Sequence, residues 1–306
     1  MAAELLLALI RANIAASVAI LAVFALRSST RRLFGAERAY GLWLAVPAAM
    51  LGALFNWSIP HGAGAAGLSV AARFWLARDG RVEGVLALWS VGALAGLGLA
   101  AASQWRFLRA ARDGRAGPAA AGIIHARLVL PADFAARFSP DERRLVLAHE
   151  RAHIARLDAR ANALAVLVQC LGWFNPMLHL AAGAMRLDQE LACDAAVMAR
   201  LPRERRRYAE TLLKTQLVQA GPLFGCRWMT RGAHPLATRI VALSRPPPTR
   251  GRQAAGVGAV ALLSLAALGV AHAAQPEQPP WPALVMTWPM TALLDLDPGP
   301  RPPPPR

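Results

Sequence analysis

Cysteine is scarce in this chain of 306 residues, and the cysteine positions exclude two kinds of structure. The three cysteines, Cys170, Cys193 and Cys226, form no CxxC pair and no even set. A small fold held by disulfides and a zinc site built from thiolates are therefore both excluded. We expect the three thiols to be buried and reduced.

Acidic residues are also few, since 18 aspartates and glutamates stand against 34 lysines and arginines, which gives a net charge of +16. Such an excess is common in nucleic-acid-binding proteins, but the chain carries no nucleic-acid-binding motif and no internal repeat. Most basic residues instead lie beside long apolar runs, where membrane proteins concentrate them on the cytoplasmic side. We therefore expect membrane lipid as a partner and no direct contact with nucleic acid.

Apolar residues are abundant, at 56% of the chain, and the mean hydropathy is positive. Four runs are long enough to cross a bilayer, at about 5–26, 41–59, 82–105 and 254–274. The first run is longer than a signal-peptide core and has no basic residue before it, so we interpret it as a retained span. The sequence predicts a multi-pass protein of the inner (cytoplasmic) membrane. Three spans lie within 1–105, and an extended, proline-rich extracytoplasmic tail occupies 275–306.

Residues 106–253 form the one segment between spans that is long enough for a folded cytoplasmic domain. A strand is expected at 122–130, before Pro131, and further helices at 187–200 and from Arg203 onwards. The apolar stretch 161–185 is long enough for another span, but it carries several polar residues. We favour a helix that packs in the domain or lies in the membrane interface, because a span would place its two flanks on opposite sides of the membrane.

A pentapeptide in this domain, His149-Glu150-Arg151-Ala152-His153, has the pattern of a zinc-hydrolase helix. Two histidines four residues apart lie on one face of a helix, and both can bind one Zn2+ ion. Glu150 can then act as the general base for water at the metal. Ser139-Pro140-Asp141-Glu142 predicts the start of this helix, because serine caps it and the glutamate completes a capping box.

A hydrolytic zinc site normally has three protein ligands, and Glu190 is the best candidate for the third. Asp194 follows one turn later on the same helix face, where its carboxylate can hydrogen-bond a ligand histidine. The alternative is that both are exposed surface charges. We expect His179 to be a packed or interfacial histidine.

Four segments in the same order resemble the BlaR/MecR-type regulatory membrane metallopeptidases. They are 128–131 (LVLP), the helix with the pentapeptide, 172–176 (GWFNP) and 190–194 (ELACD). The resemblance implies a gluzincin-like (α+β) zinc metallopeptidase domain that faces the cytoplasm, within a mainly α, multi-span protein. It implies His149, His153 and Glu190 as zinc ligands, Glu150 as the base, and cleavage of a cytoplasmic repressor or of the protein itself.

A second segment, His234-Pro235-Leu236 followed by Arg239, is similar to a segment of the HtpX-like and CAAX-processing membrane proteases. That similarity implies a catalytic role for His234, such as stabilising an oxyanion; a loop histidine without a role is the alternative. Well-known BlaR/MecR members carry a penicillin-binding sensor domain after the last span. The tail here is short and contains no Ser-x-x-Lys motif, so we expect no direct β-lactam sensing.

Two other functions remain open at this stage. One is a housekeeping protease that clears misfolded membrane proteins. The other is a non-catalytic signalling scaffold with a structural zinc, against which the intact Glu150 argues.

Overall fold

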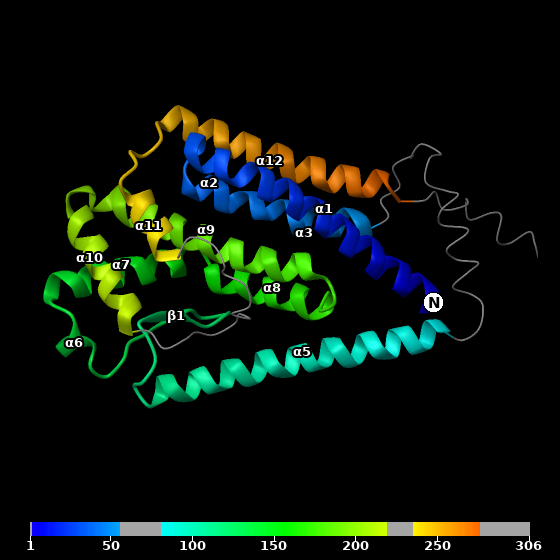
Figure 1. The fold of residues 1–306 in the computed structure, drawn as a ribbon, viewed down its shortest axis with the longest axis horizontal. Helices are drawn as coiled ribbons and strands as arrows, with labels where there is room; N and C mark the ends of the chain where they lie inside the picture. The colour runs from blue at the N-terminus through cyan, green and yellow to red at the C-terminus, as the bar shows by residue number, and fades with distance from the viewer. Residues whose placement is uncertain (1, 56–80, 219–234, 276–306) are drawn as a thin grey trace, which may run out of the picture.

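The fold is mainly α-helical in a computed structural model that describes residues 2–55, 81–218 and 235–275 (Figure 1). The N-terminal half contains α1 (Ala2–Phe34), α2 (Ala36–Gly41), the 3-10 turn η1 (Leu42–Leu44), α3 (Ala45–Leu54) and α5 (Arg81–Arg112). Then come β1 (Ala119–Ala121), β2 (Arg127–Val129), α6 (Phe134–Arg137), α7 (Pro140–Ala155), α8 (Asp158–Leu171) and α9 (Pro176–Arg200). The last elements are η3 (Pro202–Glu204), α10 (Arg205–Val218), α11 (Pro235–Leu243) and α12 (Arg250–Ala273).

Among the described residues, α1, α5 (from Val82) and α12 are long and apolar enough to cross a membrane. They follow the long axis of the molecule, and the N-terminus lies at one end of it (Figure 1). Large apolar side chains on their outer faces are exposed, including Leu94 on α5 at 67% and Leu262 on α12 at 71%. Faces of this kind are stable against lipid, and the chain is a mainly α membrane protein, as its sequence predicts.

The predicted second span at 41–59 forms shorter helical segments. Residues 36–54 pass through α2, η1 and α3, and residues 56–59 lie outside the described residues. Pro47 lacks an amide hydrogen, and the chain tightens into the 3-10 turn η1 just before α3. Because α3 packs against both α1 and α12, it runs beside two candidate spans. Whether this stretch crosses the membrane stays a prediction.

The apolar stretch 161–185, expected as one helix, is divided between two. Helix α8 ends at Leu171, and α9 begins at Pro176 and continues to Arg200, so it includes the separate helix expected at 187–200. Asn175 caps α9 by accepting a hydrogen bond from the Met177 amide at 3.0 Å. Proline suits the first turn of a helix but not its interior, so Asn175-Pro176 starts a new helix.

The expected strand at 122–130 is also shorter than the sequence suggests. Only Arg127–Val129 is extended, and it pairs antiparallel with Ala119–Ala121. The β1–β2 connection is tied to α8, because Arg160 donates hydrogen bonds to the carbonyl oxygens of Ile123 and Ile124. Among the described residues, this two-stranded sheet is the only one.

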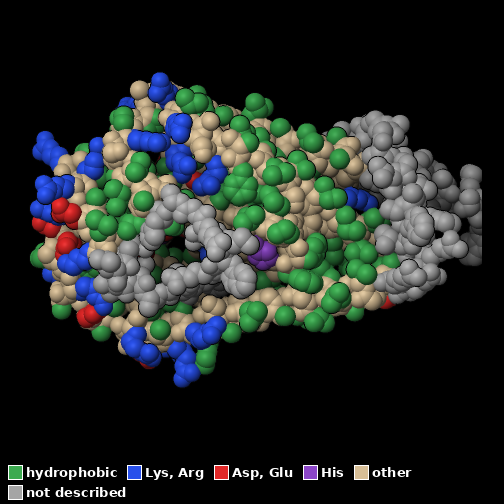
Figure 2. All heavy atoms as spheres, viewed as in Figure 1, with side chains coloured by type: hydrophobic (Ala, Val, Ile, Leu, Met, Phe, Trp, Pro, Cys, Tyr) green, Lys and Arg blue, Asp and Glu red, His purple; other side chains and the backbone are tan. Residues whose placement is uncertain are grey.

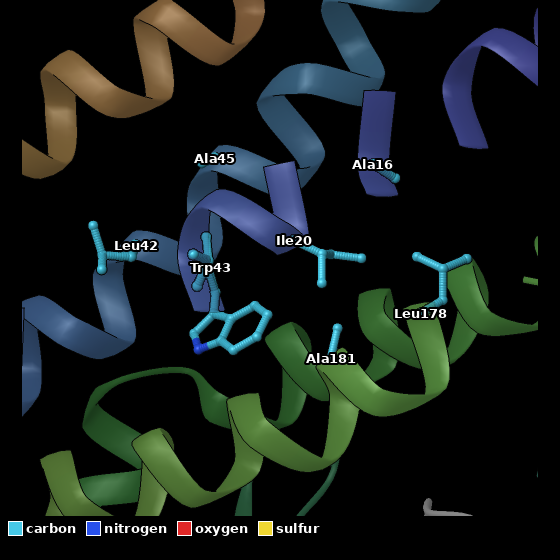
Figure 3. Close-up of a cluster of buried hydrophobic side chains, with 8 residues drawn as sticks. Ala16, Ile20, Leu42, Trp43, Ala45, Leu178 and Ala181 are labelled. Atoms are coloured by element: carbon cyan, nitrogen blue, oxygen red, sulfur yellow. The ribbon is translucent and has the colours of Figure 1, made fainter. Parts of the chain in front are cut away.

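Helix α9 belongs to two apolar cores. In the first, Leu178 and Ala181 face Ala16 and Ile20 of α1, and the ring of Trp43 reaches from η1 toward α9 (Figure 3). In the second, Val197 packs with residues of α7, α10 and α11, namely Leu145, Tyr208, Leu212 and Leu243. One rigid helix therefore joins the candidate spans to the domain that carries the pentapeptide.

Candidate metal centre

The pentapeptide lies in α7, and the start of this helix has the predicted capping box. The Ser139 hydroxyl accepts from the Glu142 amide at 3.3 Å, and the Glu142 carboxylate accepts from the Ser139 amide at 2.7 Å. Leu145 and Val146 are buried on the inner side of the helix. The helix is thus anchored at its first turn and by its apolar face, which holds His149 and His153 in place.

His149, His153 and Glu190 converge on one point. The Nε2 atoms of the two histidines are 3.1 Å apart. The Glu190 carboxylate oxygens lie 3.3 Å from His149 Nε2 and 3.6 Å from His153 Nε2. Ligands about 2.0–2.1 Å from a tetrahedral Zn2+ are roughly 3.3 Å from one another. The three atoms therefore have the spacing that one zinc ion requires. The Glu190 side chain is 34% exposed, which leaves a side of this point open to solvent.

Tyr208 and Asp194 orient His149 from behind. The Tyr208 hydroxyl donates to Asp194 Oδ1 at 2.7 Å and lies 2.8 Å from His149 Nδ1. Because its proton is directed at Asp194, the hydroxyl oxygen accepts from Nδ1–H, and the Nε2 lone pair points at the cluster. Asp194 itself lies 3.3 Å from His149 Nδ1. The structure therefore places Asp194 behind a ligand candidate, at the position that the sequence suggests.

Asp158 orients His153 in the same way. Its Oδ2 lies 2.7 Å from His153 Nδ1, so this nitrogen is the donor and Nε2 faces Glu190. The Cys193 thiol donates to the same oxygen at 3.4 Å, and Arg156 lies 3.6 Å from the other one. Asp158 reaches this position because Leu157 adopts a left-handed conformation, with φ of 59°, which turns the chain sharply between α7 and α8.

Arg239 of α11 bridges the two carboxylates of α9. It donates two hydrogen bonds to Asp194, at 2.7 and 2.8 Å, and lies 2.9 Å from Glu190 Oε2. Asp158 faces the guanidinium group of Arg156, and Glu190 and Asp194 face that of Arg239. These three carboxylates outnumber the two guanidinium groups, so the local charge attracts a cation and the donor set fits zinc.

The charges of the cluster shift the pKa values of its members. Burial alone lowers the pKa of His149, but its hydrogen bonds with Asp194 and Glu190 outweigh this effect and raise the pKa to about 10. Burial alone raises the pKa of Glu190, but the Arg239 charge and the His149 hydrogen bond outweigh it and hold that pKa below its usual range. Zinc binding at His149 therefore requires the release of a proton.

The other candidate residues have different positions. Glu150 is buried at 8% exposure, next to His149 on α7. His234 lies outside the described residues. His179 is in the first turn of α9, and its Nε2 donates to the Trp173 carbonyl at 3.0 Å. This hydrogen bond stabilises the turn between α8 and α9. Sequence reasoning missed Asp158 and Tyr208. The one available signal was that Asp158 follows His153 by five residues, at the break between two helices.

Fold and site together define a helical membrane protein with a partly buried two-histidine, one-carboxylate centre. The family model described as BlaR1 peptidase M56 matches residues 7–66 and 75–243, so the chain belongs to this peptidase family. This confirms the resemblance to the BlaR/MecR-type proteins.

Curated relatives match over a shorter region. The regulatory protein BlaR1 of Bacillus licheniformis is 34% identical over 98 residues, which are 32% of this chain and 16% of that protein. The methicillin resistance mecR1 proteins of Staphylococcus aureus and Staphylococcus epidermidis are 31% identical over 104 residues, 34% of this chain and 18% of theirs. The matched region thus spans less than a fifth of these relatives. No solved structure matches the chain.

Proposed function

We propose that this protein is a membrane-embedded zinc endopeptidase, with His149, His153 and Glu190 as the zinc ligands. The carrying observation is the mutual spacing of 3.1–3.6 Å among the three ligand atoms, which suits one tetrahedral ion. Membership of a peptidase family supports the reaction class.

Each residue of the cluster has a part in this proposal. When bound, zinc lowers the pKa of water and polarises a peptide carbonyl. Glu150 accepts the proton of the attacking water and donates it to the leaving amine. Tyr208 and Asp158 hold the two imidazoles with Nε2 toward the ligand position, and Arg239 offsets the charge of Glu190. His234 remains a proposed catalytic residue.

An exposed sheet edge offers a way to hold substrate. Strand β1 packs against α7, and among the described residues β1 and β2 each pair only with one another, so each has a second edge. An extended peptide would add to such an edge, with its scissile bond near the histidines. Proline at Leu128 should impair cleavage without displacing zinc, and normal turnover of that variant would contradict this arrangement.

The proposed domain faces the cytoplasm. Basic side chains gather at the end of the molecule opposite the N-terminus, where α6, α7 and α10 lie (Figure 1 and Figure 2). Such an excess is typical of the cytoplasmic side. Reporter fusions at Gly117 and Gln275 should therefore report opposite sides of the membrane. If they report the same side, the number of spans is wrong.

For the biological role, we propose regulated cleavage of a cytoplasmic repressor or of the protein itself. The names of the relatives, a regulatory protein and methicillin resistance proteins, support a regulatory role. A housekeeping protease would instead cut many membrane proteins. Mass spectrometry of newly formed protein termini separates the two, because regulated cleavage yields one or two fragments that require Glu150.

The test of the chemistry uses two variants of the full chain in membranes. Glu150→Gln should keep about one zinc per chain, because Glu150 is not a ligand, and lose cleavage by roughly two orders of magnitude or more. Glu210→Gln, at an exposed glutamate on α10, is the matched control and should cleave normally. If wild type binds zinc but never yields fragments that Glu150→Gln lacks, a structural zinc in a signalling scaffold is favoured instead.

A further inference from the structure

The helical hairpin formed by α8 and α9 has a second role that the metal centre does not require. We infer that the hairpin is re-entrant: it enters the bilayer from the side of the metal centre, exposes apolar side chains to lipid acyl chains, and returns to the same side. The inference depends on α1 and α5 crossing the membrane, and it stands whether or not the protein cleaves peptides.

The composition of the hairpin suits lipid. Between Arg160 and Arg186 there is no aspartate, glutamate, lysine or arginine. Its large apolar side chains are exposed along both arms and at the tip: Leu164 at 48%, Leu167 at 43%, Trp173 at 38%, Phe174 at 49% and Leu180 at 44%. Exposing so many apolar side chains to water costs free energy. This surface is continuous with the exposed apolar side chains of α5, against which α8 packs.

The depth of the tip follows from its contacts with α1. Asn175 donates hydrogen bonds to the Asn13 side chain at 3.2 Å and to the Ser17 hydroxyl at 3.0 Å. Asn13 is 14 residues, or about 21 Å of helix, from Arg27 at the basic end of α1.

The contacts with α5 give the same depth. Trp89 donates to the Leu171 carbonyl at 2.7 Å, and Trp173 donates to the Trp89 carbonyl at 3.3 Å. Trp89 is 17 residues, or about 26 Å of helix, from Arg106. Since the hydrocarbon core is about 30 Å thick, both helices place the tip well inside it.

Helix α8 is too short to cross, and only the first part of α9, from Pro176 to Met185, is free of charged residues. Helix α8 has 14 residues, which reach about 21 Å, and the chain then reverses at Gly172–Asn175. The chain is closely packed at this reversal, since a Cβ on Gly172 would lie 2.3 Å from Leu178 and 2.8 Å from Asn13. A hairpin of this length enters one leaflet and part of the next, and its two ends stay on one side.

The backbone at the tip is satisfied inside the protein, as hydrocarbon surroundings demand. The Leu171 carbonyl accepts from Trp89, and the Trp173 carbonyl accepts from His179 at 3.0 Å. The Asn175 amide donates to the Gly172 carbonyl at 2.8 Å. A non-helical turn in a bilayer persists only with such partners. A solvent-exposed turn would obtain them from water, so these contacts favour a membrane position.

Helix α5 is shaped to receive the hairpin. A Cβ on Gly92 would lie 2.2 Å from the Trp173 indole, and one on Gly96 would lie 3.3 Å from the Cys170 sulfur. Small residues that allow close helix approach are the usual device of packing within membranes. The two arms begin at Asp158 and return to Glu190, so the metal centre sits where the hairpin leaves the bilayer.

Photolabelling of the native full chain in liposomes tests the inference without mutation. A phospholipid with a diazirine at the end of its acyl chain should label Leu167, Phe174 and Leu180 as strongly as Leu94 of α5. Leu213 of α10 is the matched control, because it is 43% exposed, as Leu167 is. Labelling should be about tenfold lower there, since an acyl-chain probe does not reach a domain outside the bilayer.

Three outcomes would overturn the inference. Labelling of Leu94 without labelling of the hairpin would show that protein covers it, including a second copy of this chain. Labelling of the hairpin only by a headgroup diazirine would show an interfacial position. Equal labelling of Leu213 would show adsorption of the whole domain.

A pair of variants gives a second, independent test. Leu167→Asp should reduce the folded, membrane-integrated protein by about tenfold or more, because a carboxylate in the hydrocarbon core is strongly disfavoured. Leu213→Asp should leave the amount unchanged. Equal amounts of the two variants in membranes would contradict a lipid-facing Leu167.

Discussion

Replacing Asp158 by asparagine should weaken zinc binding although Asp158 is not a proposed ligand. The carboxylate lies 2.7 Å from His153 Nδ1, and its side chain is only 2% exposed. Asparagine has the same shape and its carbonyl oxygen can still accept the hydrogen bond. The substitution therefore removes the negative charge, which makes the imidazole a better donor to metal, and little else.

The expected loss is set by two opposing features of the site. Removing a partner of this kind typically lowers metal affinity by about 10- to 100-fold, or about 1.4–2.7 kcal/mol. Arg156, at 3.6 Å from Asp158, already offsets part of the carboxylate charge. We therefore expect the lower end, about tenfold, for Asp158→Asn. Asp158→Ala should lose more, because it also leaves Nδ1 without its acceptor and the ring free to turn.

Competition with a chelator of known zinc affinity measures this effect on purified full-length protein. Asp133→Asn is the control, since that carboxylate is 54% exposed and pairs with Arg137 on α6. The reasoning would be refuted if Asp158→Asn and Asp133→Asn bound zinc equally well. The predicted order would also fail if Asp158→Asn lost as much affinity as Asp158→Ala, because the acceptor that asparagine keeps would then contribute nothing.

Three further predictions concern stability, measured as thermal unfolding in detergent. Arg27→Gln should destabilise the protein by about 3 kcal/mol, because it removes a two-bond partner, at 2.9 and 3.0 Å, from the fully buried Asp188. Leu157→Gly should stabilise it by up to about 1 kcal/mol, because glycine accepts the positive φ of 59° without strain. A hydrogen bond from Lys214 lowers the pKa of Glu142, so the stability that this carboxylate contributes is present above its unfolded-state pKa. That stability is lost as the pH falls from about 5 through the lowered pKa.

Each of these has an outcome that would contradict it. Arg32→Gln, at an exposed arginine of α1, should change little, and an effect equal to that of Arg27→Gln would count against a specific pair. A less stable Leu157→Gly would mean that the leucine side chain contributes more than the strain costs. The loss of stability at acid pH should be smaller in Glu142→Gln. If the dependence of stability on pH is the same in this variant as in wild type, the Glu142 carboxylate is not the cause of the loss.

Local sequence patterns predicted the elements that depend on local physics. The capped start of α7 followed from Ser139 and Glu142, whose side chains bond backbone groups three residues away. The pairing of His149 with His153 followed from helical periodicity. The runs in α1, α5 and α12 followed from the length of apolar sequence that a bilayer requires. Each of these needs only residues that are close together along the chain.

Errors arose where the outcome depended on distant partners. The sequence predicts one helix over 161–185, because the pattern of apolar residues continues through Gly172–Asn175, whereas the structure has two. The reversal is favoured by partners on α1 and α5, such as Asn13 and Trp89, which periodicity within the stretch cannot reveal. The strand at 122–130 was overestimated for the same reason, since its length depends on β1.

The sequence by itself determined that this is a helical membrane chain, with two histidines on one face of a capped helix and a candidate third ligand some forty residues later. It also suggested Asp194 behind a ligand histidine, but only the tertiary structure decided which other residues lie behind the ligands. Asp158, Tyr208 and Arg239 reach the cluster from a turn and two other helices, at 2.7–2.9 Å from their partners. The helical periodicity of a sequence predicts which face of its own helix a residue occupies. The packing of α7, α9, α10 and α11 determines which faces meet.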